Sequence, residues 1–253
     1  MTRTIAKGTM RSHTVRKFRR RLRLYLSDKP SLYWPLAKAI NGNFLVSRAT
    51  ELVVEGFPRS GNSYAEAAFR LSQKRQVCLA HHRHAAAQVL CAAKWQIPCV
   101  VLIREPFEAI RSLLMHQPAL YRLDNAVREY IVFYRAIQPV RKCYVLARFE
   151  TVTQDFGSVI GALNAHFGTR FLGFDSGYIS EAKVFSEIDR LGRLRGTVGR
   201  RGEPYSINRS VAERTEREQQ KQASKGMLEA EAERHLMRSA NRLYTDLASG
   251  ADV

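Results

Sequence analysis

The chain has 253 residues, and its 41 Lys and Arg against 23 Asp and Glu give a formal net charge of +18 at pH 7. This length suits one α/β domain with a large core, and the lack of any run of about 18 apolar residues predicts no membrane-spanning helix. A positive excess of this size favours a polyanionic partner, an acidic membrane surface or a highly charged cofactor. Four cysteines without C-x-x-C or metal-finger spacing predict free, buried thiols in a reducing compartment such as the cytoplasm.

Residues 1–30 are predicted to form a basic arm ahead of the domain. Nine Lys and Arg precede the first acidic residue, Asp28, and apolar residues recur at helical spacing between Val15 and Leu26. A basic amphipathic helix lying on an anionic membrane surface fits this pattern, and so does a solvated arm. No apolar segment follows the charges as in a secretory signal, and the few aromatic residues give no specific nucleic-acid signature.

A strand, a loop with two glycines and a helix come next, after a short helix and loop over residues 31–48. Leu52–Val54 predicts a strand buried on both faces, Gly56–Gly61 the loop, and Asn62–Leu71 the helix. Glycines let such a loop approach a phosphate, and the first N–H groups of the helix point at the anion. An ordinary βα turn is the alternative interpretation.

The loop differs from a nucleotide-hydrolysing P-loop at one position. The Walker pattern G-x-x-x-x-G-K-[ST] becomes Gly56-x-x-x-x-Gly61-Asn62-Ser63, with asparagine in place of lysine. A kinase needs that lysine on the β- and γ-phosphates. The loop is therefore expected to hold an anion but is poorly suited to metal-assisted hydrolysis of a nucleoside triphosphate.

Three histidines follow the second predicted strand, Val77–Ala80. They are His81, His82 and His84, and the carboxyl end of their strand should face the same crevice as the loop. A zinc site is weakly indicated, because no matching Cys or carboxylate accompanies them. A general base acting on a hydroxyl group is the better interpretation, and a polar strand end without function is the alternative.

A second basic position follows the most apolar predicted strand, Ile97–Ile103. Arg104 ends this strand, and Ser112 lies eight residues later, about two turns into a helix that starts near Phe107. Arginine suits phosphate because its guanidinium binds two oxygens at once. A helix-capping turn with a surface arginine is the alternative for this segment alone.

The remaining pattern completes an α/β domain. A helix over Asp124–Ala136, a strand over Cys143–Phe149 with Glu150 at its end, and a helix over Val159–Phe167 are predicted. A basic loop is expected over residues 189–209, and a charged helix from Ser210 to about Ala248, whose second half packs on the domain. The predicted fold is a three-layer α/β/α P-loop type with a central parallel sheet and helical flanks, in one domain over residues 31–253.

Two segments resemble the signatures of the PAPS-dependent sulfotransferases. Residues 57–64, Phe-Pro-Arg-Ser-Gly-Asn-Ser-Tyr, resemble that family's 5′-phosphosulfate loop, and Arg104-x-Pro with Ser112 resembles its 3′-phosphate signature. The resemblance implies that Arg59 contacts the transferring sulfuryl group and stabilises charge there. It implies cofactor binding by Arg59, Ser60, Gly61, Asn62, Ser63, Tyr64, Arg104 and Ser112, with Tyr64 stacked on adenine.

The same resemblance implies a reaction. His82 aligns with the family's catalytic histidine, with His84 as the second choice, and would take the proton of an acceptor hydroxyl as sulfuryl is transferred from PAPS without a metal. A late basic segment, Arg200-Arg201-Gly202, resembles the family's closing segment over the nucleotide. The basic surface suggests a carbohydrate or lipid acceptor.

Two other functions remain open from the sequence. A P-loop nucleotide kinase predicts Mg²⁺-dependent use of ATP, against which Asn62 argues. A non-enzymatic protein that binds polyanions or a membrane surface predicts binding that falls steeply with salt and does not need Arg59 or Ser112.

Overall fold

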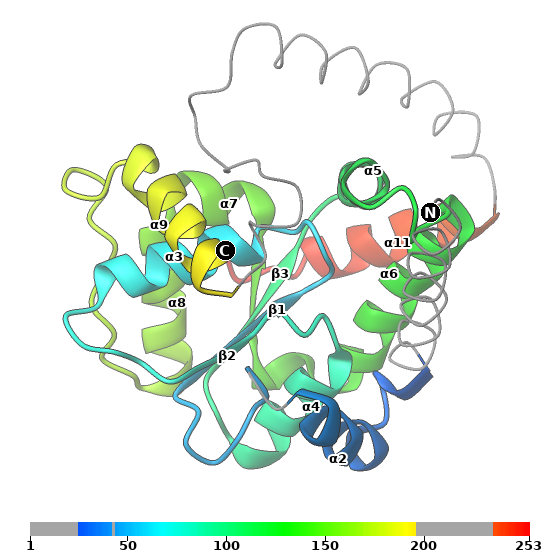
Figure 1. Ribbon diagram of the computed structural model, residues 1–253, viewed down its shortest axis with the longest axis horizontal. Coiled ribbons are helices and arrows are strands. Elements are labelled where there is room, and N and C mark those ends of the chain that lie inside the picture. The colour runs from blue at the N-terminus through cyan, green and yellow to red at the C-terminus, as the bar shows by residue number, and fades with distance from the viewer. Residues whose placement is uncertain (1–24, 42–43, 196–234) are drawn as a thin grey trace, which may run out of the picture.

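The computed structural model describes residues 25–41, 44–195 and 235–253 (Figure 1). Its strands are β1 (Leu52–Gly56), β2 (Leu79–His81), β3 (Cys99–Ile103) and β4 (Val145–Arg148). The helices are α2 (Pro30–Asn41), α3 (Asn62–Ser72), α4 (Ala86–Trp95), α5 (Pro106–His116), α6 (Leu123–Ile137), the 3-10 helix η1 (Gln138–Cys143), α7 (Phe149–Gln154), α8 (Phe156–Phe167), α9 (Glu181–Leu194) and α11 (His235–Ala248).

The strands form one parallel sheet in the order β2-β1-β3-β4. Val53 of β1 pairs with Ala80 of β2, and Val100 of β3 pairs with Val145 of β4. Parallel neighbours need long crossover connections, which the helices between the strands provide. Because all four strands run in the same direction, their carboxyl ends lie at one edge, where loops can build a ligand site.

Alternate strand residues point into two different cores, one on each face of the sheet. Val53 and Val101 pack with residues of α4, α5, α6 and α11 on one face. Leu52 and Val100 pack with residues of α3, α7, α8 and α9 on the other. The result is a sheet between two helical layers (Figure 1), an α/β fold whose strands are buried on both faces as their apolar runs predict.

The end of the chain is attached to β4. The Leu146 amide donates to Asp252 Oδ2 at 2.7 Å, and the Arg148 amide donates to the Val253 carbonyl oxygen at 2.9 Å. The predicted packing of the last helix on the domain is confirmed, because Leu243 and Leu247 of α11 belong to one of the two cores. Within the described ranges, no helix is long and apolar enough to cross a membrane.

Two sequence-based expectations need correction. The basic segment that was expected to be a loop from residue 189 onward is helical as far as Leu194, because Val184, Ile188 and Leu191 recur at helical spacing and bury one face of α9. The thiols are not all buried: Cys91 and Cys99 are, but two others are exposed. Those two, Cys78 and Cys143, lie just before β2 and at the end of η1.

Candidate functional site

The loop between β1 and α3 runs close to the sheet because of its two glycines. A Cβ on Gly56 would lie 2.6 Å from the Leu102 carbonyl oxygen, so a larger residue would push β3 away. Gly61 has φ 92°, and a Cβ there would lie 3.3 Å from Phe149 Cδ2. Glycine adopts this left-handed conformation without the steric cost that other residues incur. The loop therefore turns sharply into the N-terminus of α3, where unpaired backbone N–H groups lie.

Arg59 and Ser112 come from separate sequence motifs and are hydrogen-bonded to each other. Arg59 Nε donates to Ser112 Oγ at 3.0 Å, and Arg104 Nη1 donates to the Arg59 carbonyl oxygen at 3.1 Å. Arg59 also has φ 73°, a strained conformation for a residue with a side chain, and such strain concentrates at functional sites. The β1–α3 loop and the start of α5 thus meet at the carboxyl ends of β1 and β3. We call Gly56–Ser63, Arg104 and Ser112 the loop site.

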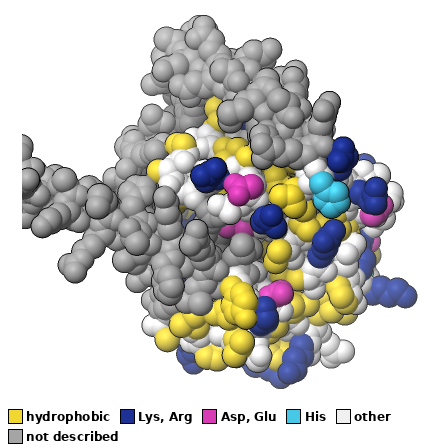
Figure 2. All heavy atoms as spheres, turned by 90° about the vertical axis from the view of Figure 1, so that its right-hand side faces the viewer, with side chains coloured by type: hydrophobic (Ala, Val, Ile, Leu, Met, Phe, Trp, Pro, Cys, Tyr) yellow, Lys and Arg dark blue, Asp and Glu magenta, His cyan; other side chains and the backbone are white. Residues whose placement is uncertain are grey.

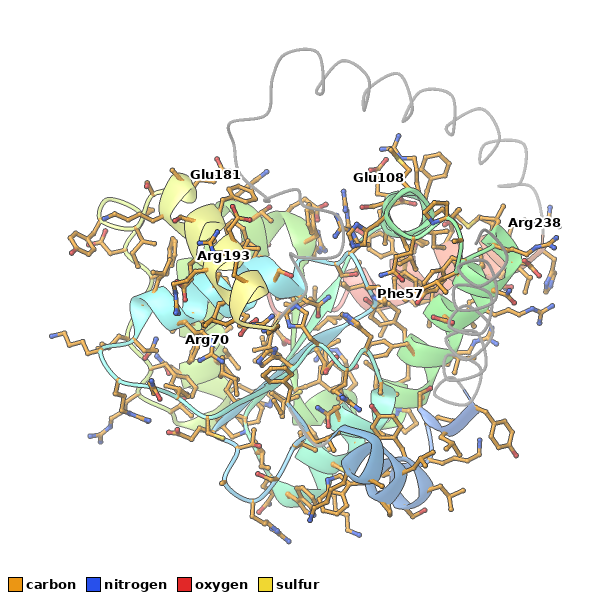
Figure 3. The ribbon with its side chains drawn as sticks, in the orientation of Figure 1. Phe57, Arg70, Glu108, Glu181, Arg193 and Arg238 are labelled. Atoms are coloured by element: carbon orange, nitrogen blue, oxygen red, sulfur yellow. The ribbon has the colours of Figure 1, made fainter. Side chains whose placement is uncertain are left out.

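The guanidinium of Arg104 is fixed from several sides. Its Cζ lies 4.0 Å from the centre of the Phe149 ring, and its Nη2 lies 3.5 Å from Glu108 Oε2 on α5. Burial lowers the pKa of Arg104, yet a guanidinium keeps its charge at any physiological pH. Figure 3 labels Glu108 at α5 and Phe57 below it, near the ends of the strands. A permanent positive charge therefore stands at the end of β3.

Two buried polar atoms of the loop site have no hydrogen-bond partner within the part of the chain that the structure covers. Asn62 Nδ2 donates to the Phe57 carbonyl oxygen at 3.0 Å, but Asn62 Oδ1 is unsatisfied, and so is Ser60 Oγ. Buried polar atoms are nearly always paired with protein, water or ligand. The Ser60 hydroxyl group could donate to an anion beside the helix N-terminus, whereas Asn62 Oδ1 can only accept, so a water or another donor would satisfy it.

Tyr64 lies on the first turn of α3 and contacts α9. Its ring packs edge-on against Phe185 with 6.2 Å between the centroids, and burial raises the pKa of its hydroxyl. The ring is half-buried. The resemblance assigned Tyr64 to adenine, and its present aromatic neighbour is a protein side chain.

The histidines after β2 contact α3 rather than open solvent. His82 Nε2 is 3.0 Å from Ser63 Oγ, and His82 Nδ1 is 2.7 Å from His81 Nδ1. His82 has φ 56° and His84 has φ 49°, so the backbone is strained at both positions. The Ser63 contact links His82 directly to the loop site.

Glu66 is the fully buried carboxylate behind these histidines. Its oxygens accept from Arg70 Nε at 2.9 Å and from Arg195 Nη2, and they lie 3.3 Å from His81 Nε2 and 3.5 Å from His82 Nδ1. Figure 3 places Arg70 on the side of α3 that faces β2. We call Glu66, Arg70, His81, His82 and Arg195 the Glu66 cluster. Two guanidinium groups share one carboxylate, so the cluster carries a net positive charge even with neutral imidazoles.

Among the described residues, one group could hold a metal ion by its geometry. It consists of Glu66, His81 and His82, whose ligand atoms lie within 4.8 Å of one another. Zinc would accept such ligands. However, Arg70 and Arg195 already bind the carboxylate, and their positive charges oppose a divalent cation at the same oxygens. The arrangement therefore fits a hydrogen-bonded ionic cluster better than a metal centre.

Burial and the two arginines keep the imidazoles neutral. Burial, the adjoining His82 and the arginines lower the pKa of His81 to about 2, and burial with Arg195 and Arg70 lowers the pKa of His82 to about 3. Neutral His82 can accept a proton, but it is a weak base until negative charge arrives beside it. A bound anion at the loop site would supply that charge.

His84 faces a different partner. Its Nδ1 is 2.9 Å from the Gly56 carbonyl oxygen, and its amide donates to Glu55 Oε2 at 2.8 Å. The Arg83 amide donates to the other oxygen of Glu55, also at 2.8 Å. Burial raises the pKa of Glu55 to about 7 despite these bonds. His84 therefore helps to hold the loop start, whereas His82 is the histidine that contacts the helix N-terminus.

The structure brings most of the predicted site together at one edge of the sheet. Arg59, Ser112 and Arg104 are joined by hydrogen bonds, and His82 reaches the same loop through Ser63. Arg200, Arg201 and Gly202 lie outside the described residues. Sequence reasoning missed Glu66 and Arg70, although their i,i+4 spacing on one helix predicts an ion pair. Comparisons with protein-family models, curated proteins and solved structures give no match.

Proposed function

We propose that the chain is a PAPS-dependent sulfotransferase with a P-loop-type α/β/α domain. The observation that carries the proposal is the contact of the two motifs, through the Arg59–Ser112 hydrogen bond of 3.0 Å and the Arg104–Arg59 hydrogen bond of 3.1 Å. Neither motif alone requires the other, since 53 residues separate Arg59 from Ser112. Their meeting at the ends of parallel strands supports one bisphosphorylated ligand that spans both.

The proposed mechanism assigns each group a separate task. The backbone amides of the loop and of the first turn of α3 hold the 5′-phosphate end, and Arg104 with Ser112 holds the 3′-phosphate. Arg59 stabilises the charge that develops on the bridging oxygen as the sulfur–oxygen bond breaks. The acceptor oxygen bonds to sulfur, 3′,5′-ADP leaves, and the proton of the acceptor hydroxyl passes to His82 Nε2.

The Ser63–His82 contact gives the base its place in this scheme. Ser63 Oγ lies 3.0 Å from His82 Nε2, which is the distance at which an acceptor hydroxyl would be deprotonated. The phosphosulfate carries negative charge, which would raise the low pKa of His82 toward neutrality when the cofactor binds. His84 is the second candidate base, because donation from its Nδ1–H to the Gly56 carbonyl oxygen leaves Nε2 as the nitrogen that can accept a proton.

The test is calorimetric binding of 3′,5′-ADP, 5′-AMP and ATP to the full chain without Mg²⁺. Wild type should prefer 3′,5′-ADP, and Arg104→Ala should weaken that nucleotide at least about tenfold while leaving 5′-AMP nearly unchanged. Arg128→Ala is the matched control, because Arg128 is an exposed arginine of α6. Equal binding of all three nucleotides, or equal losses in both variants, would reject the sulfotransferase and leave a general polyanion binder.

A further inference from the structure

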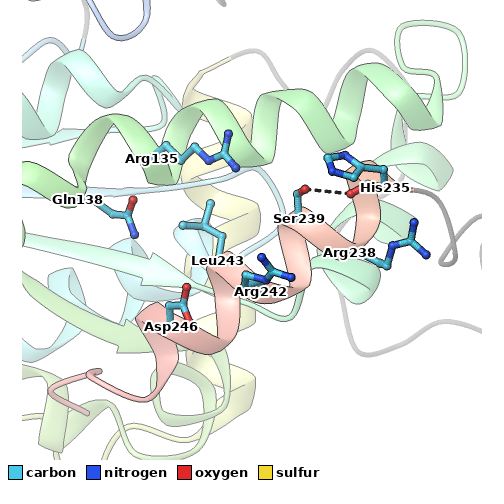
Figure 4. Close-up of a pocket in the computed structure, with 8 residues that line it drawn as sticks. All are labelled: Arg135, Gln138, His235, Arg238, Ser239, Arg242, Leu243 and Asp246. Atoms are coloured by element: carbon cyan, nitrogen blue, oxygen red, sulfur yellow. Dashed lines mark hydrogen bonds between the residues drawn. The ribbon is translucent and has the colours of Figure 1, made fainter.

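A cavity of about 240 Å³ that is open to solvent lies between α6 and α11; its charged lining residues are exposed, and no residue of the loop site or the Glu66 cluster lines it. Its lining residues are Arg135, Gln138, His235, Arg238, Ser239, Arg242, Leu243 and Asp246 (Figure 4). Neither sequence motif includes any of these residues. The cavity is therefore a feature of the fold that the proposed reaction does not use.

Helical spacing explains why so many nitrogen donors converge there. His235, Arg238 and Arg242 are spaced at i, i+3 and i+7 on α11, so they share one face of the helix. Arg135 and Gln138 supply the facing side at the end of α6 and the start of η1. Buried Leu243 belongs to the core between the two helices. Rigid helices thus support the charged side chains on both sides.

The charge of the lining is not neutralised from within. Three arginines and one aspartate give it a formal charge of 3 − 1 = +2 with His235 neutral. Figure 4 shows one hydrogen bond among the eight residues, from Ser239 Oγ to the His235 carbonyl oxygen at 2.9 Å. Arg242 and Asp246 have the i,i+4 spacing of an ion pair, yet no bond between them is drawn. Within residues 25–41, 44–195 and 235–253, no ion pair involves Arg135, Arg238 or Arg242, so these exposed guanidinium groups can reach an anion.

The two ends of the cavity differ in chemistry. In Figure 4, His235 and Arg238 lie at one end, Gln138 and Asp246 lie at the other, and Arg135 and Arg242 lie between them. Positive charge suits a phosphate or sulfate group, whereas an amide and a carboxylate accept hydrogen bonds from hydroxyl groups. The volume is below the roughly 300–1,000 Å³ that is usual for drug-sized ligands, so the cavity suits a small molecule.

We propose that this cavity is a second anion site, which binds the phosphate or sulfate ester of a small polyhydroxyl compound, such as a sugar. The oxyanion lies between Arg238, Arg242 and Arg135, and the hydroxyl groups face Asp246 and Gln138. Figure 2 turns the right-hand side of the molecule toward the viewer and shows further Lys and Arg side chains on its coloured part. These side chains attract the same class of ligand over a longer range.

The test is titration of the full chain with inorganic phosphate, inorganic sulfate, glucose 6-phosphate and glucose, with 3′,5′-ADP present in excess to fill the loop site. Glucose 6-phosphate should bind more tightly than either inorganic ion, and glucose should not bind measurably. Arg238→Ala/Arg242→Ala should weaken glucose 6-phosphate at least about tenfold, since two charge-assisted contacts are lost. A preference for inorganic sulfate over phosphate would identify the ester as a sulfate.

The matched control is Arg122→Ala/Arg128→Ala, which removes the same charge from exposed positions at the start of α6. It should change the affinity for glucose 6-phosphate less than about twofold, as expected for screened distant charges. Asp246→Ala should tighten inorganic phosphate and remove the advantage of the sugar ester. Equal losses in the two double variants, or no binding of any ester, would overturn the second site.

This result is separable from the proposed sulfotransferase activity. Arg238→Ala/Arg242→Ala should bind 3′,5′-ADP as wild type does, because the cavity shares no residue with the loop site. Arg104→Ala should bind glucose 6-phosphate as wild type does. If 3′,5′-ADP does not bind at all, the same titrations without it still decide whether the cavity takes an ester.

Discussion

The loop site and the Glu66 cluster are neighbours that use arginine in opposite ways. At the loop site, Arg59 donates to a serine hydroxyl, and Arg104 donates to a carbonyl oxygen and lies 3.5 Å from the half-exposed Glu108 carboxylate. In the Glu66 cluster, Arg70 and Arg195 both donate to one fully buried carboxylate. The fully buried Glu66 holds its two arginines within the fold, whereas Arg59 and Arg104 lie at the edge of the sheet beside a helix N-terminus, where the proposed nucleotide would bind.

The two sites should also respond differently to substitution. A buried charge network is costly to leave partly satisfied, so the Glu66 cluster must keep all its members to hold α3, β2 and the end of α9 together. The loop site contains unsatisfied polar atoms at Ser60 and Asn62, which a ligand can complete. We therefore expect substitutions in the cluster to change stability first and substitutions in the loop site to change binding first.

The largest expected effect is that of Glu66→Ala. Removing the carboxylate leaves two partly exposed guanidinium groups without their anion, so the free energy of unfolding should fall by about 2–3 kcal/mol, less than the roughly 3–5 kcal/mol of a fully buried pair. Urea denaturation at pH 7 measures this loss. Binding of 3′,5′-ADP to the remaining folded protein should change far less than in Arg104→Ala.

Glu51→Gln provides the control for a surface ion pair. Glu51 pairs with Arg75, whose side chain is 64% exposed, and also accepts from the Cys78 amide. The change should cost about 1 kcal/mol or less, because solvent screens exposed pairs. If Glu66→Ala lowered the free energy of unfolding no more than Glu51→Gln does, the Glu66 cluster would not stabilise the fold as we expect.

Gly61→Ala is expected to break the loop site specifically. The left-handed φ of 92° would cost an alanine about 1–2 kcal/mol, and the new Cβ would press on Phe149 at 3.3 Å and Val152 at 3.4 Å. The loop should shift, and 3′,5′-ADP binding should fall at least about tenfold. Calorimetry and denaturation on the same sample separate the two effects.

Gly168→Ala is the matched control for backbone strain. Gly168 ends α8 with φ 65°, and a Cβ there would meet nothing within 4 Å. The same kind of strain should therefore lower stability by about 1 kcal/mol without any change in nucleotide affinity. A loss of nucleotide binding in both variants would mean that general destabilisation, not loop geometry, controls the site.

The strand, the glycine turn and the helix around the loop site could be predicted because their signals are local in the sequence. The apolar run before Gly56 predicts a buried strand, and the glycines at 56 and 61 mark backbone that only glycine fits, as the close approach to Leu102 shows. That Arg104 follows a second such run predicts that it reaches the same edge of a parallel sheet. The hydrogen bond from Arg59 to Ser112 needed coordinates, since spacing alone does not place two side chains in contact.

The Glu66 cluster was invisible to the same reasoning because it is non-local. Glu66 lies 129 residues from Arg195, and a glutamate four residues before an arginine usually indicates an exposed helical pair. Only the packing of α9 on α3 buries this carboxylate. The wrong extent of the basic loop has the same origin, because charged residues hid the apolar face of α9.

The pH dependence of stability is a smaller effect and tests the Glu66 cluster. Below pH 6.5, the unfolded chain takes up protons at His81 and His82, whose folded pKa values are about 2 and 3. The free energy of unfolding should therefore decrease as the pH is lowered. Glu55, with a folded pKa of about 7, takes up its proton in the folded state first and opposes this fall down to about pH 4.5. Each proton that one state binds and the other does not changes the free energy of unfolding by about 1.4 kcal/mol per pH unit.

Glu55→Gln removes the opposing term, so unfolding by urea between pH 6.5 and 5 should show a steeper loss of stability than in wild type. His81→Asn/His82→Asn should flatten or reverse the slope. Matching slopes in wild type and both variants would mean that these groups do not titrate as their burial requires.

The smallest effect is expected for Ser112→Ala, which tests whether this serine of the loop site contributes to nucleotide binding. The variant removes the hydroxyl group that is assigned to the 3′-phosphate and that accepts from Arg59 Nε, and losing a hydrogen bond of about 0.5–1.5 kcal/mol should weaken 3′,5′-ADP roughly two- to tenfold. Affinity for 5′-AMP should stay constant, because the serine is assigned to the 3′-phosphate. Equal weakening of both nucleotides would instead make Ser112 a support for the Arg59 side chain, and the two motifs would then meet for structural reasons alone.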